Sequence, residues 1–376
     1  MKESNKIYLF ANFGDWNKVP YGGGEVGNRR TLKLLQQAGF EVITIPKYLR
    51  VANHSILNLI KLSWRIVYNI IQYSIILLFG GRKQAFVHIV GFYGSMIYFE
   101  YTLIHIAKLL GYNVVYEMRG GGADMYIKKG TKLYISIFKK AIMKSDVIFS
   151  QGMENKPLIE SIKPNPSFFY YPNYVMSEFC PSTYPIKAYN TINLVYFGRI
   201  SPTKNIDIVI SAFVLLRKKY GNIQLDIIGN CSDEQYLNTI KTTINESGYE
   251  KSVHIYPACN HDQLKKYLSD KHFYIFPSTE PHEGHSNALT EAMAWGVIPI
   301  ATPQGFNRSV INDKRLIVKE LNPNNFANII SSIIDNQEIE KYSHQVYDRI
   351  SNNYTDIIIL HKLKNEYDKL FNIYQQ

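Results

Sequence analysis

Cysteine is scarce in this 376-residue chain, which contains only Cys180, Cys231 and Cys259. They are far apart and form no C-x-x-C pair, which excludes a disulfide framework and a zinc site of the usual spacing. A reducing cytoplasm is therefore the expected compartment. The sequence also lacks a D-x-D triad that would carry a divalent ion, so we expect no metal.

Long apolar runs are scarce as well. The N-terminus passes directly into strand-like sequence, without the apolar segment and small-residue cleavage site of a signal peptide. The most apolar run, residues 66–80, is interrupted by Asn69 and Gln72. At about 15 residues it is expected to be too short to span a bilayer.

Negative charge is scarce in the first half. Residues 1–180 contain 22 Lys and Arg against 11 Asp and Glu, whereas residues 181–376 contain 20 of each. A basic half suggests an anionic partner such as a lipid surface, although a solvated surface explains the charge equally well. No helix-turn-helix, zinc finger or RNA-binding aromatic pattern is present, so nucleic acid is not expected as a partner.

One basic segment favours a membrane surface. Residues 58–83 interleave apolar and aromatic side chains with Lys61, Arg65, Arg82 and Lys83, as helices that lie in a membrane interface do. The alternative is an ordinary domain helix with one buried face.

Short apolar, β-branched runs alternate with helical patterns along most of the chain. This alternation is typical of parallel strands joined by crossover helices. It lapses at residues 172–191, where three prolines and no steady period indicate a linker. The sequence therefore predicts an α/β protein with two Rossmann-like, doubly wound domains that face a central cleft. The expected strands lie at residues 6–13, 41–47, 85–91, 113–120, 146–152, 168–175, 193–200, 223–230, 253–258, 273–278 and 297–302.

Polar residues follow two of the strands expected in the second half. Arg199 lies at the end of the strand expected at residues 193–200, and Lys204 lies just beyond it, before a helix. Two cations at this position would bind a diphosphate. Glu283 and Glu291 follow residues 273–278, and Ser286 between them is a plausible N-cap. Phosphate and sugar hydroxyls are the ligands that such a strand edge suits.

Near the N-terminus, Gly22, Gly24 and Gly27 match the G-x-G-x-x-G pattern of dinucleotide sites. The context disfavours that function, because Gly22 lies nine positions beyond the first strand. The second strand also ends in Pro46 and Lys47, with no acid for a ribose. What remains is a glycine loop before a helix at about residues 25–38.

Two of these segments together resemble a known family. FGRISPTKN at 197–205 and EGHSNALTEAMAWGVIPIAT at 283–302 resemble the donor-binding motifs of retaining glycosyltransferase family 4, group 1 enzymes of the GT-B fold. The two acids of the family's E-x7-E motif match Glu283 and Glu291. GGGE at 22–25 resembles the family's N-terminal loop, and YPNYV at 171–175 resembles its P-N-G-V segment.

The resemblance implies a retaining, metal-independent, hexosyltransferase-type enzyme without a cofactor, whose co-substrate is a nucleotide-diphosphate sugar. Residues 1–180 would bind the acceptor and residues 181–355 the donor, and a helix at 356–376 would pack back on the first domain. Arg199 and Lys204 would hold the diphosphate, Glu283 would contact the transferred sugar, and these three form the expected catalytic set. The expected donor-binding set is Gly23, Gly24, Gly229, Gly284, His285, Ser286, Asn287, Ala288 and Glu291.

The prediction of the acceptor-binding residues rests on fewer positions. Arg119 stands where the family commonly has a histidine, and it is expected near the acceptor together with His88; a satisfied core histidine is the alternative for His88. The basic first half suggests a lipid-linked saccharide acceptor in bacterial capsule, exopolysaccharide or O-antigen assembly. The protein would then be cytoplasmic or peripheral on the inner face of the membrane. The alternatives are a GT-B-fold sugar-nucleotide epimerase and a non-catalytic nucleotide-sugar-binding protein.

Overall fold

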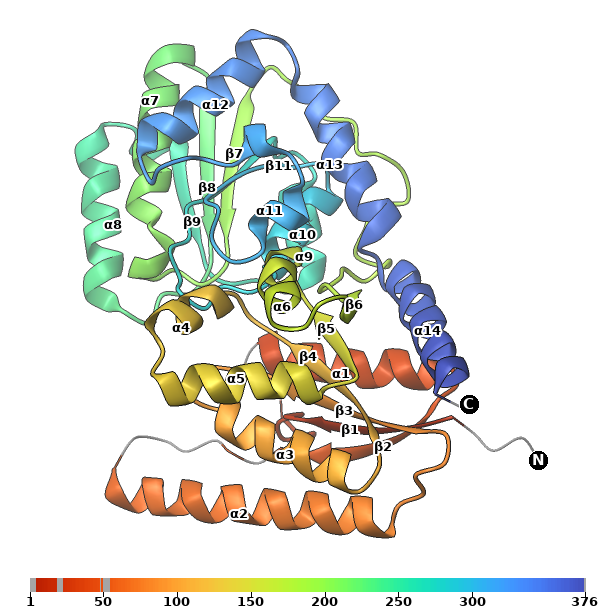
Figure 1. The fold of residues 1–376 in the computed structure, drawn as a ribbon. Helices are drawn as coiled ribbons and strands as arrows, with labels where there is room; N and C mark the ends of the chain where they lie inside the picture. The colour runs from red at the N-terminus through yellow and green to blue at the C-terminus, as the bar shows by residue number, and fades with distance from the viewer. Residues whose placement is uncertain (1–4, 19–22, 48, 50–54, 375–376) are drawn as a thin grey trace. The chain divides into compact units, whose positions relative to one another are not determined.

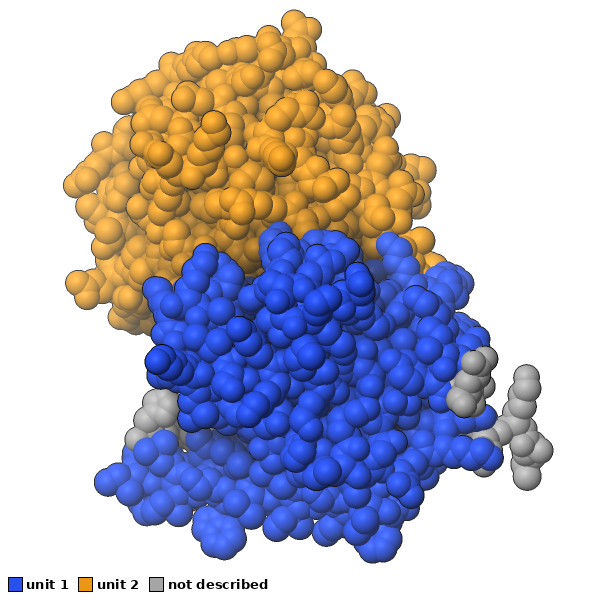
Figure 2. Space-filling model, viewed as in Figure 1, with its two compact units in different colours: residues 1–172, 359–376 blue, residues 173–358 orange. Residues whose placement is uncertain are grey.

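A computed structural model describes residues 5–18, 23–47, 49 and 55–374. The chain forms two compact units, shown in Figure 1 and Figure 2. Unit 1 comprises residues 1–172 and 359–376, and unit 2 comprises residues 173–358. Gly22, the first glycine of the G-x-G-x-x-G match, lies outside the described residues.

Unit 1 is built on a six-stranded parallel sheet with the strand order β2-β1-β3-β4-β5-β6 (Figure 1). Strands β1, β3 and β4 are buried along almost their whole length, which explains their continuous apolar runs. The strands are β1 (Lys6–Ala11), β2 (Glu41–Pro46), β3 (Ala85–Gly91), β4 (Asn113–Met118), β5 (Val147–Ser150) and β6 (Ser167–Tyr170).

Helices cover this sheet, and the last of them comes from the C-terminus of the chain. Phe371 packs against Phe86 with ring centroids 5.0 Å apart, and Tyr367 packs against Phe40 at 5.4 Å. The C-terminal helix therefore completes the core of unit 1. The helices are α1 (Gly23–Gln37), α2 (Ile56–Phe79), α3 (Ile97–Leu109), α4 (Ala123–Lys129), α5 (Lys132–Lys144), η1 (Met153–Asn155), α6 (Lys156–Ile162) and, from residue 359 on, α14 (Asp356–Ile373).

Unit 2 has a five-stranded parallel sheet with the order β11-β10-β7-β8-β9. Its strands are β7 (Ile192–Phe197), β8 (Ile223–Ile228), β9 (Val253–Tyr256), β10 (Phe273–Phe276) and β11 (Ile298–Ala301). Its helices are η2 (Pro202–Lys204), α7 (Ile206–Tyr220), α8 (Glu234–Ser247), η3 (Glu250–Ser252), α9 (His261–Leu268), α10 (Asn287–Ala294), α11 (Asn307–Ile311), η4 (Lys314–Leu316), α12 (Pro323–Asp335) and α13 (Ile339–Asn353). The predicted α/β class with two doubly wound sheets is confirmed.

The strand order reverses once in each sheet. In unit 1 the chain first places β2 beside β1 and then returns to the other side of β1 with β3. In unit 2 it builds outward from β7 through β8 to β9, then places β10 on the other side of β7. Ligands of open α/β sheets bind beyond the carboxyl ends of the strands at such a switch point. The residues after β7 and β10 in unit 2, and after β1 and β3 in unit 1, are therefore the ones to compare.

The apolar run at residues 66–80 lies in a longer helix than expected. Helix α2 has 24 residues and is, by length and composition, long and apolar enough to cross a membrane, so the expectation of a segment too short to span was wrong. Asn69 does not end the helix, because its side-chain amide donates to the carbonyl oxygen of Arg65 one turn earlier, at 2.6 Å.

Candidate functional site

The ends of β7 and β8 approach so closely that both need glycine. Gly198 has a φ of 133°, which side-chain-bearing residues rarely adopt. A Cβ on Gly229 would lie 1.9 Å from the carbonyl oxygen of Gly198. Gly198 is exposed at the tip of the sheet, whereas Gly229 is buried, and the Ile200 side chain would lie 3.4 Å from a Cβ on Gly229.

The two cations beyond β7 lie in different surroundings. The Arg199 side chain is 65% exposed, and its Nη2 lies 3.4 Å from an oxygen of Glu280. The Lys204 side chain is 11% exposed, forms an ion pair with Glu283 and donates to Ser278 Oγ at 3.2 Å. Arg199 is thus accessible to an incoming anion, whereas Lys204 is already held by a carboxylate.

Glu283 is fixed in both its side chain and its backbone. Ser278 Oγ donates to the same Glu283 oxygen that Lys204 binds, at 2.6 Å. A Cβ on Gly305, whose φ is +59°, would lie 2.4 Å from the Glu283 carbonyl oxygen. The Lys204–Glu283 pair therefore joins the segment after β7 to the segment after β10, at the switch point of unit 2.

Helix α10 begins at this edge of the sheet. Ser286 is its N-cap, as predicted, and its Oγ accepts a hydrogen bond from the Leu289 amide at 3.4 Å. Helix geometry leaves the amides of Asn287 and Ala288 without an intrahelical acceptor, and the helix dipole gives this end a partial positive charge. Glu291 lies one turn further along, with its Oε1 3.3 Å from His261 Nε2.

These elements enclose a cavity of about 410 Å³ within unit 2. Its volume is in the range of sites for small molecules. The residues that line it come from the ends of β7 and β8, from α9 and the segment before it, and from α10, which contributes the Glu291 carboxylate. The lining residues are Phe197, Gly198, Arg199, Ile228, Gly229, Asn230, Ala258, Cys259, His261, Leu264, Ala288 and Glu291.

Four of the predicted residues line this cavity, namely Arg199, Gly229, Ala288 and Glu291. Other predicted residues are not among its lining residues. His285 is buried, its ring packs 5.7 Å from that of Tyr354, and its carbonyl oxygen accepts from Asn173 Nδ2 at 3.0 Å. Gly284 is in the same tight loop, where its carbonyl oxygen would lie 2.9 Å from a Cβ on Gly305.

The sequence reasoning missed two residues beside the cavity. His261 pairs with Glu291, and Glu280 contacts both Arg199 and Thr203, whose Oγ1 donates to Glu280 at 2.9 Å. His261 begins α9 directly after an Asn260 capping box, and this local pattern marks the helix start beyond β9. Glu280 has no such pattern, since only the fold brings it to Arg199.

In unit 1, the predicted glycines begin α1. A Cβ on Gly23 would meet no atom within 4 Å, so the space in front of this residue is open. A Cβ on Gly24 would lie 3.3 Å from the ring of Phe92, which follows β3. The two glycines therefore lie at the switch point of unit 1, beside the ends of β1 and β3.

His88 and Arg119 are joined in a buried network rather than exposed at that edge. Arg119 is 4% exposed and forms an ion pair with Glu117 through Nε. Its other nitrogens donate to Asn28 Oδ1 at 2.7 Å and to Thr31 Oγ1 at 2.8 Å, both on α1. A Cβ on Gly27 would lie 2.6 Å from the guanidinium. Arg119 thus fastens the first turns of α1 to the end of β4.

The other end of the network reaches the C-terminal helix. His88 is fully buried, and its Nε2 lies 2.8 Å from Glu117 and its Nδ1 2.7 Å from the hydroxyl of Tyr367 on α14. Burial alone would raise the pKa of Glu117, but the Arg119 guanidinium and His88 outweigh it and lower the pKa to about 2. Glu117 is therefore a carboxylate that holds β3, β4 and, through Arg119, α1 together.

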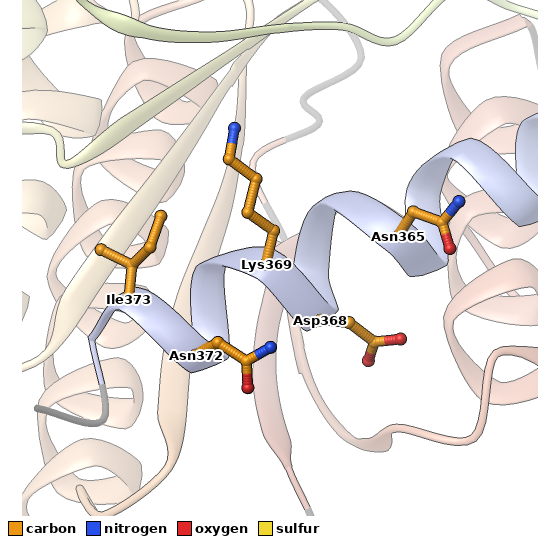
Figure 3. Close-up of a pocket in the computed structure, with 5 residues that line it drawn as sticks. All are labelled: Asn365, Asp368, Lys369, Asn372 and Ile373. Carbon is orange, nitrogen blue, oxygen red and sulfur yellow. The ribbon is translucent and has the colours of Figure 1, made fainter.

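A further hollow lies on the surface of α14 and carries none of the predicted residues. Figure 3 shows that its five lining residues are spread along this single helix; they are Asn365, Asp368, Lys369, Asn372 and Ile373. Within the described part of the chain, no group of three or more His, Cys, Asp or Glu residues is placed to hold a metal ion.

Comparison with known proteins connects this geometry to a family. Residues 187–351, which include the whole unit 2 cavity, match the family described as glycosyl transferases group 1. No curated protein matches the chain in sequence.

Solved structures show the same fold over almost the whole chain. Sucrose-phosphate synthase from Thermosynechococcus elongatus is 16% identical with a TM-score of 0.72, covering 98% of this chain and 100% of that one. A glycosyltransferase from Rickettsia africae is 16% identical with a TM-score of 0.69, covering 98% and 99%. HepE from Anabaena, in complex with UDP, is 12% identical with a TM-score of 0.67, covering 97% and 100%. The two Rossmann-like units therefore form a GT-B fold.

Proposed function

We propose that this chain, whose residues 187–351 form a group 1 glycosyltransferase domain, transfers a hexose-type sugar from a nucleotide diphosphate to a saccharide acceptor with retention of anomeric configuration. The observation that carries the proposal is the unit 2 cavity at the switch point between β7 and β10. A cation, a helix N-terminus and a carboxylate meet there, and these are the groups that recognise a phosphate and a hydroxylated sugar.

The diphosphate occupies the positive part of the cavity in this proposal. The exposed guanidinium of Arg199 and the α10 amides at Asn287 and Ala288 donate to its oxygens. Gly198 and Gly229 both line the cavity, so the phosphates approach the strand tips at two residues that carry no side chain. Gly23 and Gly24 begin α1 at the switch point of unit 1, and their part in donor binding stays a prediction.

Lys204 reaches the leaving group by exchanging partners. It is now bound to Glu283 and Ser278, both of which come from the segment after β10. A doubly charged diphosphate competes with a single carboxylate for this ammonium. Glu283, once partly released, is then available to accept hydroxyl protons of the transferred sugar.

Glu291 is assigned to the ribose. Its carboxylate lines the cavity and has a histidine, not a lysine or arginine, as its neighbour at 3.3 Å. Such a carboxylate retains acceptor capacity for two adjacent hydroxyl groups.

The reaction breaks the bond between the anomeric carbon and the phosphate oxygen. Negative charge develops on the diphosphate as that bond breaks, so donors already aimed at it stabilise the transition state more than the ground state. Arg199, Lys204 and the α10 amides supply these donors without a metal ion. The departing phosphate oxygen takes the acceptor's proton on the same face, which accounts for retention.

The acceptor is assigned to residues 1–180, and the proposed acceptor is a lipid-linked saccharide at the cytoplasmic face of the membrane, in surface polysaccharide assembly. The contacts of His88 and Arg119 support a positioning role, in which they hold α1 and its glycines in place, more than direct contact with an acceptor.

The test is acceptor-dependent release of nucleoside diphosphate from a panel of nucleotide-sugars, with and without EDTA. UDP-sugars come first, because the Anabaena protein binds UDP. We expect release that depends on a saccharide acceptor and persists in EDTA. Interconversion of the sugar without release would instead indicate an epimerase, and binding without either reaction would indicate a non-catalytic protein.

A further inference from the structure

Helix α2 exposes a continuous apolar face. Six of its large apolar side chains recur every three or four residues, which places them on one side of the helix. Each is 47–71% exposed; they are Ile60, Trp64, Val67, Ile71, Ile75 and Leu78. Leu57 and Phe79 extend the exposed apolar surface to both ends of the helix. A surface of this kind marks an interaction site, because soluble proteins rarely expose contiguous apolar patches of this length.

The opposite face of α2 is anchored in unit 1. Tyr73 and Leu77 are buried, and the Tyr73 hydroxyl donates to the carbonyl oxygen of Leu103 on α3 at 3.1 Å. The Leu77 carbonyl oxygen accepts from the Tyr112 hydroxyl at 2.8 Å. Figure 1 shows α2 running beside α3 at the edge of unit 1. The apolar face is therefore turned outward by specific contacts.

These contacts also determine whether α2 would cross a membrane or lie in its interface. The helix is long and apolar enough to cross a bilayer by length and composition. Crossing would require Tyr73 and Leu77 to leave the core of unit 1. A helix that keeps one face on its own domain and offers the other to lipid lies in the interface plane.

The positive charge around α2 favours an anionic partner. No Asp or Glu occurs at residues 42–99, which contain six Lys and Arg. Four of these cations are exposed, Lys61 and Arg65 on α2 and Arg82 and Lys83 just beyond it. A second copy of the chain would bring the same positive charge to this face, which disfavours a dimer. An anionic bilayer complements both the apolar face and its cations.

We infer that the outward face of α2 inserts among the headgroups and upper acyl chains of a bilayer that contains anionic lipids. The six apolar side chains enter the boundary region, and the four cations bind lipid phosphates. This deepens the proposed function, because it places unit 1 where a lipid-linked acceptor would be. The docking itself does not depend on sugar transfer.

The experiment is co-sedimentation of the full-length protein with vesicles of phosphatidylcholine, alone or with phosphatidylglycerol. The test variant is Trp64→Glu/Ile71→Glu, and the control is Ile186→Glu, which makes the same kind of substitution once, at a side chain that is 92% exposed and lies in unit 2. We expect wild type and control to bind anionic vesicles with similar affinity. The affinity of the double variant should be lower by a factor of about ten or more. Lys61→Ala and Arg65→Ala should each weaken binding by about fivefold.

A second readout does not depend on a folded double variant. Trp64 should shift its fluorescence to shorter wavelength on binding anionic vesicles, and the shift should disappear in Trp64→Phe, which retains Trp16 and Trp295. The inference is overturned if wild type fails to bind, if the double variant binds as well as Ile186→Glu, or if the patch mediates a dimer without vesicle binding. Cleavage of the donor in solution tests the proposed function and does not test membrane binding. Vesicle binding without any transfer would count against the proposed function alone.

Discussion

The carboxyl ends of the strands in the two sheets place similar residues in opposite situations. In unit 2, Arg199 beyond β7 is largely exposed and lines a cavity. In unit 1, Arg119 beyond β4 is buried, and all three of its nitrogens are bound within the unit. An arginine after a parallel strand is therefore not in itself a ligand site. Its role depends on whether the fold supplies partners for the whole guanidinium.

The same contrast applies to the carboxylates. Glu117 faces two cationic or polar partners in the core and stays ionised with a pKa of about 2, whereas Glu291 faces a cavity and a half-exposed histidine. The unit 1 network fixes the position of α1, and the unit 2 groups remain available to a ligand. Substitutions in the unit 1 network and at the unit 2 cavity should accordingly change different properties.

The largest effect is expected at Arg119. Arg119→Ala would leave the Glu117 carboxylate buried without its guanidinium and would release α1. Breaking a buried ion pair in this way costs about 3–5 kcal/mol of unfolding free energy. Urea unfolding should show this loss, whereas the exposed Arg82→Ala control should stay within about 0.5 kcal/mol of wild type. Normal stability with lost transfer in Arg119→Ala would instead support direct contact with an acceptor.

At the unit 2 switch point, Lys204→Ala should act on catalysis. Loss of one donor to the leaving group reduces turnover by about a hundredfold, and we expect Glu291→Ala to have a similar effect through the ribose. The measurement is kcat for donor cleavage in the presence of acceptor. The control is Lys241→Ala, an exposed lysine on α8. Near-normal turnover in Lys204→Ala and Glu291→Ala would remove the proposed diphosphate site.

The stability of unit 2 should depend on pH through His272, which directly precedes β10. Burial, together with nearby Lys187, lowers the pKa of His272 from 6.5 to about 4. The imidazole accepts from the Asn193 amide at 3.0 Å and donates to the Ala188 carbonyl oxygen at 3.0 Å. As the pH falls below 6.5 the unfolded chain takes up a proton before the folded one, so stability decreases until about pH 4. Between pH 7 and pH 5 this amounts to about 2 kcal/mol.

His272→Gln, which preserves an acceptor and a donor, should flatten this pH dependence in thermal melts. An unchanged slope would show that another group is responsible.

The smallest effect is expected at Arg199. Because its side chain is mostly exposed and screened, Arg199→Ala should weaken donor binding by about tenfold, corresponding to one charge-assisted hydrogen bond. Isothermal titration with the nucleoside diphosphate measures it. A loss of donor affinity of about a hundredfold would contradict the distinction between the exposed Arg199 and the ion-paired Lys204.

Sequence patterns predicted the strands and one edge of the candidate site because these depend on local features. Each strand run is apolar and bounded by turn residues, and Ser286 caps α10 through a bond to a residue three positions away. The partners of Arg119 were not predictable, since Asn28 and Thr31 lie 91 and 88 residues away. The length of α2 was missed because Asn69 reads as an interruption, whereas the helix satisfies its amide internally.

The account's central claim is that the unit 2 cavity binds the donor's diphosphate, and a crystal structure of the chain with UDP tests it most directly. We predict the diphosphate within hydrogen-bonding distance of Arg199 or Lys204 and of the amides at the start of α10, with the ribose hydroxyls on Glu291. A diphosphate bound elsewhere, or bound in the cavity without contact to any of these groups, would contradict the claim.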